Sequence, residues 1–111
     1  MTSLSTHVLD TMHGRPAAGM PVALSGPDGE IARGTTNGDG RCPDLAQGGL
    51  APGRYALRFA VADYFRAQGV ALPDPPFLDE VAVDFGVAVD GGHYHVPLLV
   101  SPYGYSTYRG S

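Results

Sequence analysis

The sequence of 111 residues has one cysteine, few cations and no long hydrophobic run, and each shortage excludes a class of protein. Cys42 cannot form an internal disulfide by itself, and no cysteine or histidine spacing is that of a structural zinc site. No stretch approaches the ~20 apolar residues of a membrane span, and no apolar run follows a basic start as in a signal peptide. We therefore expect a cytoplasmic protein with no membrane partner.

The charge balance argues against nucleic acid as a partner. Seven lysine and arginine residues stand against eleven aspartate and glutamate residues, which gives a formal net charge of -4. Proteins that bind a phosphate backbone usually carry a basic stripe, and this chain has too few cations for one. We expect no nucleic-acid partner, and any cation in a functional site must be placed there locally.

The length of 111 residues suits one domain that covers residues 1–111. A domain of this size buries roughly two-thirds of the surface that its unfolded chain exposes, which is enough for one modest core. The ten prolines and sixteen glycines separate alternating apolar runs and do not form a low-complexity tract. They are typical of turns, and we find no linker and no internal repeat.

Strict alternation of apolar and polar residues predicts half-buried strands. Residues 80–89 are the clearest case, because Val81, Val83, Phe85, Val87 and Val89 all fall on one face. Residues 55–61 alternate in the same way, and shorter strands are predicted at residues 6–9, 20–25 and 31–35. Many short strands with turns between them indicate an all-β protein built as a two-sheet β-sandwich.

One short helix interrupts this pattern. Asp63 is a suitable capping residue at its start, and Gly69 is suited to end it after residues 64–68. The sequence therefore predicts a sandwich with a single brief helix between two strands.

Residues 93–100 form a predicted strand whose two faces differ. Tyr94, Val96, Leu98 and Val100 occupy the core face, whereas His93, His95, Pro97 and Leu99 occupy the other. Exposed proline and leucine beside two histidines would be an unusual solvent surface, so we expect a second subunit to cover this face. The alternative is a pair of partly exposed histidines on an ordinary strand. Pro97 also predicts an edge strand or a bulge, because proline offers no ladder donor, and an edge strand can pair with its copy.

Three separated segments carry a family resemblance: residues 5–11 (STHVLDT), residues 37–41 (NGDGR) and the ending at residues 108–111 (YRGS). Together they resemble the 5-hydroxyisourate hydrolases, the enzyme branch of the transthyretin-like family. The resemblance implies a transthyretin-like fold and hydrolysis of 5-hydroxyisourate, in which water opens a lactam ring during urate and purine degradation. It implies no cofactor and no metal. Chain ends usually fray, but residues 93–107 before this ending are strand-forming and rich in hydrogen-bonding side chains, so we expect an ordered tail.

The resemblance assigns roles to individual residues. His7 and His95 match the two histidines of the family motifs, and either can be the general base, since imidazole suits proton transfer at neutral pH. We assign water activation or proton relay to His95 and substrate contact with a second proton transfer to His7. Arg41 matches the substrate-binding arginine and can hold an oxygen through two hydrogen bonds. Tyr108 can stack on a planar substrate and hydrogen-bond to it.

The ending adds Ser111, which we assign to the catalytic set because it supplies a hydroxyl and a carboxylate. We rank it with Tyr108 above Arg109, which can instead hold the tail. Each assignment has a purely structural alternative. The histidines can simply be hydrogen-bonded at an interface, and Arg41 can be a solvated arginine of a loop. Three histidines can also form a zinc site, and His93, His95 and His7 are the candidates here. No nucleophile elbow is present, which favours direct attack by water.

Two other functions remain open. Transthyretin-like sandwiches also serve as non-catalytic carriers of small molecules, and similar modules have purely structural roles. The set of His7, Arg41, His95 and the YRGS ending favours the enzyme, because the resemblance associates it with that branch. For assembly we expect a homotetramer, a dimer of dimers with sites at the subunit interfaces.

Overall fold

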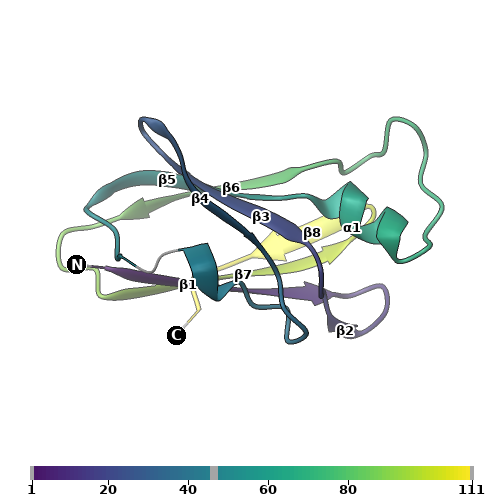
Figure 1. The fold of residues 1–111 in the computed structure, drawn as a ribbon, viewed down its shortest axis with the longest axis horizontal. Helices are drawn as coiled ribbons and strands as arrows, with labels where there is room; N and C mark the ends of the chain where they lie inside the picture. Colours follow the sequence, from purple (N-terminus) through teal and green to yellow (C-terminus); the bar gives the residue numbers. More distant parts are fainter. Residues whose placement is uncertain (1, 46–47, 111) are drawn as a thin grey trace.

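The computed structural model describes residues 2–45 and 48–110, which form two four-stranded sheets packed face to face (Figure 1). The first sheet has the order β2 (Arg15–Pro16), β1 (Ser3–Asp10), β7 (His93–Ser101), β8 (Gly104–Thr107). The second has the order β4 (Gly29–Thr35), β3 (Pro21–Gly26), β5 (Gly53–Phe59), β6 (Val81–Val87). A 3-10 turn, η1 (Pro43–Leu45), follows β4. The predicted two-sheet β-sandwich is confirmed.

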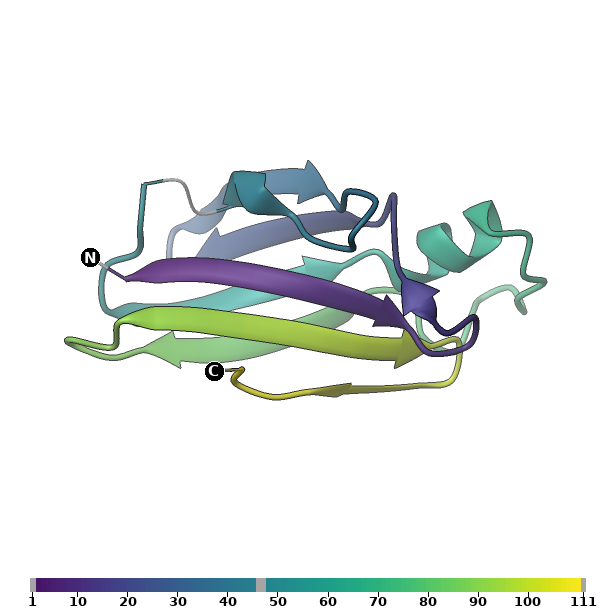
Figure 2. The same cartoon turned by 90° about the horizontal axis from the view of Figure 1, so that it is seen from below.

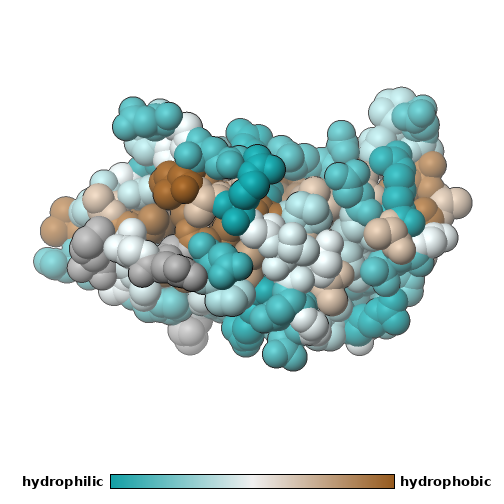
Figure 3. All heavy atoms as spheres, viewed as in Figure 1, coloured by the Kyte–Doolittle hydropathy of each residue, from teal (hydrophilic) through white to brown (hydrophobic). Residues whose placement is uncertain are grey.

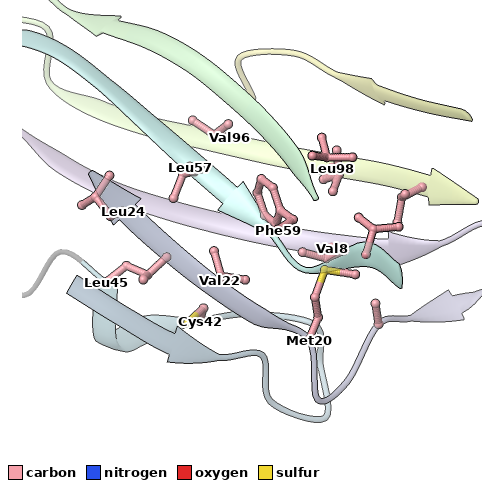
Figure 4. Close-up of a cluster of buried hydrophobic side chains, with 14 of the residues drawn as sticks. Val8, Met20, Val22, Leu24, Cys42, Leu45, Leu57, Phe59, Val96 and Leu98 are labelled. Atoms are coloured by element: carbon pink, nitrogen blue, oxygen red, sulfur yellow. The ribbon is translucent and has the colours of Figure 1, made fainter. Parts of the chain in front are cut away.

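The core lies between the sheets and is filled from both sides (Figure 4). Val8 and Leu98 enter it from the first sheet, and Leu24, Leu57 and Phe59 enter it from the second; all five are fully buried. These residues occupy alternate positions of their strands, so the other face of each strand is left for polar groups. The burial of this shared apolar surface is the main term that holds the two sheets together.

The alternation predicted for residues 80–89 holds only over β6. Val81 and Val87 are buried and Val83 and Phe85 are partly buried against the core, as predicted. Val89 is 75% exposed, so its assignment to the core face was wrong. The strand ends at Val87, and the chain then turns toward β7 through residues 88–92, where alternation no longer determines the face.

The helix α1 (Val61–Ala67) begins earlier than predicted. Its N-cap is Ala60 without a side-chain hydrogen bond, so the prediction that Asp63 caps the helix was wrong. Asp63 instead lies in the first turn, where a negative charge interacts favourably with the helix dipole. Gly69 follows the last turn with a φ of +84°, as expected for the residue that ends a helix.

A buried carboxylate ties α1 to the end of β1. The hydroxyl of Tyr64 donates a 2.7 Å hydrogen bond to Asp10, and the backbone N–H and ring of His13 also bond to this carboxylate. Burial alone raises the pKa of Asp10, but the hydrogen bonds from His13 and Tyr64 outweigh it, so the pKa lies below its usual value. Burial and the neighbouring Asp10 together raise the pKa of Tyr64 to about 12.

The strand β7 lies inside its sheet and not at an edge, so the edge prediction from Pro97 was wrong. It pairs in parallel with β1 and antiparallel with β8, as Figure 2 shows. The β8 ladder ends at Leu98 and Thr107, and one further bridge between His95 and Gly110 keeps the same register. Pro97 sits at the interruption, where the Thr107 hydroxyl donates a 2.7 Å hydrogen bond to its carbonyl oxygen. Pro97 is already buried within the single chain, so its burial does not require the second subunit that was expected to cover this face.

Arg109 holds the last part of the chain in place. The backbone of this part runs along the first sheet (Figure 2). Its guanidinium donates hydrogen bonds of 2.9 Å to the carbonyl oxygen of Gly91 and 3.2 Å to that of His93. It also lies 3.9 Å from the centre of the Tyr94 ring, a cation–π contact. The expectation of a fixed tail is confirmed through residue 110.

The surface and the helix content add two observations. On the face in Figure 3, hydrophobic residues form separate small patches among hydrophilic ones. Over residues 2–45 and 48–110, no helix has the length and apolar character needed to cross a membrane.

Candidate active site

The parallel pairing of β1 with β7 places polar side chains from both strands in rows on the outer face of the first sheet. Ser3 is level with His93, Ser5 with His95, and His7 with Pro97. Partners in register point to the same side of a sheet, and alternate residues of each strand share that side. His7 and His95 therefore lie on one face although 87 residues separate them in the chain.

A tight turn brings Arg41 to the same place. The side-chain oxygen of Asn37 accepts hydrogen bonds from the backbone N–H groups of Asp39 and Arg41, at 3.0 and 3.1 Å. The turn is then joined to β1, because Arg41 forms a bridge with His7 and the N–H of Val8 donates to the carbonyl oxygen of Gly40 at 2.8 Å. Residues 37–40 thus position Arg41.

Gly40 is required where the turn meets β1. Its φ is +76°, and a Cβ atom there would lie 2.4 Å from the carbonyl oxygen of Val8 and 3.3 Å from the ring of His7. Any side chain would push the turn away from the strand, so the close approach of Arg41 and His7 depends on this glycine.

His95 is surrounded by cationic and titratable groups. Burial lowers its pKa, and the charges of Arg41, His7 and His93 lower the pKa further. The imidazole is therefore held in its neutral form, in which one ring nitrogen can accept a proton. His7, Arg41 and His95, which come from three distant segments, are brought together at one place.

The tail contacts His95 directly. The N–H of Gly110 donates a 2.8 Å hydrogen bond to the carbonyl oxygen of His95, and a Cβ atom on Gly110 would lie 2.5 Å from the His95 ring. Tyr108 is 60% exposed, and it lines a hollow of about 280 Å³ beside β6 to which His7, Arg41 and His95 do not belong. The structure therefore brings the tail backbone to the histidines but not the Tyr108 ring. Ser111 lies outside the described residues.

Ser5 is a site residue that the sequence analysis did not single out. Its hydroxyl lies 2.7 Å from Nδ1 of His95 and 2.9 Å from Nε2 of His93. Ser5 opens the motif segment of residues 5–11 and shares the alternation of His7, but the strand that it faces cannot be known without the pairing. In the described part of the chain, no three histidine, cysteine or acidic side chains are arranged to hold a metal ion.

Two hollows differ in their relation to this site. One of about 160 Å³ lies between β1 and the 37–43 loop and includes Ser5, Asn37 and Arg41 in its lining. The largest described hollow, about 880 Å³, is an open depression at the second sheet, and no histidine lines it. We place the site by the meeting of His7, Arg41 and His95 and not by the volume of a hollow, since no histidine lines the smaller hollow and none of these three residues lines the larger one.

The model of the HIUase/Transthyretin family matches residues 4–110. The chain belongs to this family. It is 53% identical over 115 residues to the 5-hydroxyisourate hydrolase of Caulobacter vibrioides, and the match covers 100% of both chains. The resemblance found in the three motif segments is thereby confirmed at the level of the family.

Solved structures of the family agree with the fold. The 5-hydroxyisourate hydrolase of Klebsiella pneumoniae superimposes with a TM-score of 0.88 at 36% identity, and 100% of each chain is covered. Transthyretin from Sparus aurata superimposes with a TM-score of 0.83 at 29% identity, covering 96% of this chain and 95% of that one. The same sandwich is therefore shared by a 5-hydroxyisourate hydrolase and by a transthyretin, so the fold alone does not fix the function.

Proposed function

We propose that this protein hydrolyses 5-hydroxyisourate, a step of urate degradation, by direct attack of water on a lactam carbonyl. The observation that carries the proposal is the meeting of His7, Arg41 and His95 on the outer face of β1 and β7. Relatives at more than half identity over the full chain are named for this activity, which favours the enzyme over the carrier.

His95 is the proposed general base. Its lowered pKa keeps the imidazole unprotonated at neutral pH, so Nε2 can take a proton from the attacking water. Within the described residues this nitrogen has no hydrogen-bond partner, whereas Nδ1 is held near Ser5. The ring therefore presents its free nitrogen to a substrate.

The other groups orient the substrate and complete proton transfer. The Arg41 guanidinium binds the carbonyl oxygen on which negative charge develops, and it stays charged at every relevant pH. His7 contacts the substrate and gives a proton to the ring nitrogen as the bond to carbon breaks. Tyr108 and Ser111 are proposed to contact the substrate from the tail, which requires the Tyr108 ring to turn toward the histidines.

We propose that a second subunit completes the site in a homotetramer. The hollow beside Arg41, about 160 Å³, is smaller than the ~300 Å³ at which ligand pockets usually begin. Leu9 and Leu99 form the next row beyond His7 on the same face, and both are only partly buried in the single chain. An apolar row beside a shallow polar site is suited to be covered by another copy. The exposed edge of β8 offers a second contact between copies.

The assembly is tested by Leu99→Glu, with Ser25→Ala on the second sheet as the control. We expect the Glu variant to lose the larger assembly in analytical ultracentrifugation and to lose activity with it. A fully active monomer would contradict the shared site.

The cytoplasm is the proposed compartment, which suits the free, buried thiol of Cys42.

The activity is tested by following the ultraviolet decay of freshly made 5-hydroxyisourate with and without the protein. We expect the wild type to accelerate the decay, and we expect the double variant His7→Asn, His95→Asn to lose this effect while its circular dichroism stays unchanged. An unaccelerated decay with folded wild type would reject the enzyme. A fully active double variant would reject only the catalytic roles assigned to the two histidines.

A further inference from the structure

Four side chains of β1 and β7 form a continuous line of hydrogen-bonding groups that begins at His95. The Oγ of Ser5 lies 2.7 Å from Nδ1 of His95 and 2.9 Å from Nε2 of His93. Nδ1 of His93 is in turn 2.5 Å from the Oγ of Ser3. His95 is half-buried, whereas His93 and Ser3 are exposed, so the line leads from the site to the surface.

We propose that Ser5 and His93 form a proton relay that carries the proton of the attacking water from His95 to solvent. This inference rests on the proposed role of His95 as the base. It assigns Ser5 and His93 as positioning residues, which act on the reaction only through His95.

The hydrogen bonds can all point one way. When Nε2 of His95 is free to accept, Nδ1 carries the proton and donates to Ser5. The Ser5 hydroxyl then donates to Nε2 of His93, whose Nδ1 proton donates to Ser3. In this direction the tautomers of the two rings are linked, because a proton on Nδ1 of His95 goes together with a proton on Nδ1 of His93.

The reaction gives the relay a proton to carry. Hydrolysis forms a carbon–oxygen bond from water and breaks the carbon–nitrogen bond. His7 gives its proton to the ring nitrogen, and one of the two water protons replaces it on His7. The other must leave, because the product carboxylic acid has a pKa near ~4 and ionises at neutral pH. No oxidant or further reactant is needed.

Transfer proceeds by one hop at each contact. Nε2 of His95 takes the proton of water while its Nδ1 proton passes to Ser5, the Ser5 proton passes to His93, and Nδ1 of His93 releases a proton through Ser3. When the product leaves, Nε2 of His95 gives its proton to water, and a proton from solvent returns through Ser3, His93 and Ser5 to Nδ1 of His95, which restores the starting tautomers with one proton released per turnover.

The charges around His95 favour movement in this direction. Arg41 from the loop, His7 from β1 and His93 from β7 are the groups that face it, and all three disfavour a positive charge on its ring. A relay lets the base accept a proton at Nε2 while it gives one up at Nδ1, so the imidazolium is not formed beside Arg41.

The test compares Ser5→Ala, Ser5→Thr and His93→Gln in the full-length protein, with the enzyme-free decay subtracted at each buffer concentration. We expect Ser5→Ala and His93→Gln to lower kcat about tenfold with KM within about twofold of wild type. Ser5→Thr keeps the hydroxyl and should retain most of the rate. Added imidazole, a small proton carrier, should restore much of the rate of His93→Gln, which a purely structural defect would not allow.

Ser25→Ala is the matched control, because Ser25 lies on a strand of the other sheet and is also partly buried. A wild-type kcat in Ser5→Ala, or a loss in His93→Gln that imidazole does not change, would overturn the relay. If Ser5→Ala does not fold, the exposed position His93 decides the outcome. An inactive wild type would reject the proposed function, whereas an active one with unaffected relay variants rejects the relay alone.

A second measurement does not depend on turnover. The ¹⁵N chemical shifts of the free protein should place the proton of neutral His95 on Nδ1 and move toward the other tautomer in Ser5→Ala. A proton on Nε2 in the wild type would contradict the direction of the relay.

Discussion

The N–H of Gly110 donates a 2.8 Å hydrogen bond to the carbonyl oxygen of His95, and the same glycine lies directly against the His95 ring. The backbone of the tail therefore contacts both the backbone and the imidazole ring of the proposed base. The space between them is too small for a methyl group, since a Cβ on Gly110 would lie 2.5 Å from Cδ2 of His95.

Replacing Gly110 by alanine should therefore lower activity without unfolding the protein. The added methyl group must displace either the tail or the imidazole, and a shift of about 1 Å at a catalytic group can cost about a hundredfold in rate. We expect a fall in kcat of about ten- to a hundredfold in the ultraviolet assay, with the melting temperature nearly unchanged.

Gly48→Ala is the control for this substitution, because nothing lies within 4 Å of the position that its Cβ would occupy. It should have wild-type activity. Equal activity in Gly110→Ala and Gly48→Ala would mean that the contact between the tail and His95 has no catalytic role.

Arg109→Ala should release the tail. The guanidinium holds two carbonyl oxygens and the Tyr94 ring, so its loss removes all three contacts at once. We expect faster amide hydrogen exchange at residue 110 and a loss of about 1 kcal/mol in the free energy of unfolding. Arg109→Lys keeps the charge but not the planar fork and should be intermediate. Unchanged exchange in the alanine variant would show that β8 alone fixes the tail.

Arg41→Met should raise the pKa of His95. The cation beside the imidazole disfavours its protonated form, so its removal makes protonation easier and moves the pKa up toward the ordinary value of 6.5. An NMR titration of the His95 ring measures this without relying on turnover. Arg54→Met, at a position on the second sheet, should leave the titration unchanged. A lower pKa in Arg41→Met would reverse the assigned electrostatics.

Asp10→Asn should destabilise the link between β1 and α1. Breaking a buried charged group away from its partners costs about 3 kcal/mol, measured by urea unfolding at neutral pH. The pKa of Asp10 is lower in the folded protein than its ordinary value of 3.8, so its contribution to stability is present above pH 3.8 and is lost as the pH falls through the folded pKa. Wild type and variant should therefore converge in stability at acid pH. A constant difference down to about pH 2 would exclude the carboxylate as its source.

Much of the fold follows from local patterns in the sequence. Strand alternation gave the buried faces of β5, β6 and β7, because burial on one side of a sheet imposes a period of two. The end of α1 at Gly69 was also predictable from a residue that adopts positive φ without strain.

The errors arose where pairing between strands decides the outcome. Pro97 suggested an edge, yet β8 accommodates it by interrupting its ladder at the position where the proline lacks a donor. The role of Ser5 was not visible because the register that sets it opposite His95 joins residues 90 apart. Such pairings are set by the whole fold and leave no local signal.

For the site, the sequence identified His7, Arg41 and His95 through the family resemblance, and the structure brings the three together. It could not give the orientation of Tyr108, because a side chain on an exposed tail takes its position from whatever packs on it. The assignments to individual steps of the reaction remain predictions for the experiments above.

The parallel pairing of β1 with β7 also bears on how the protein would regain function after denaturation. Hairpins such as β3–β4 close over a few residues, whereas Ser3 and His93 must find each other across most of the chain. Closing so large a loop is slow because its entropic cost is met before any contact forms. Recovery of turnover should therefore be among the last events of refolding, later than the appearance of sheet structure.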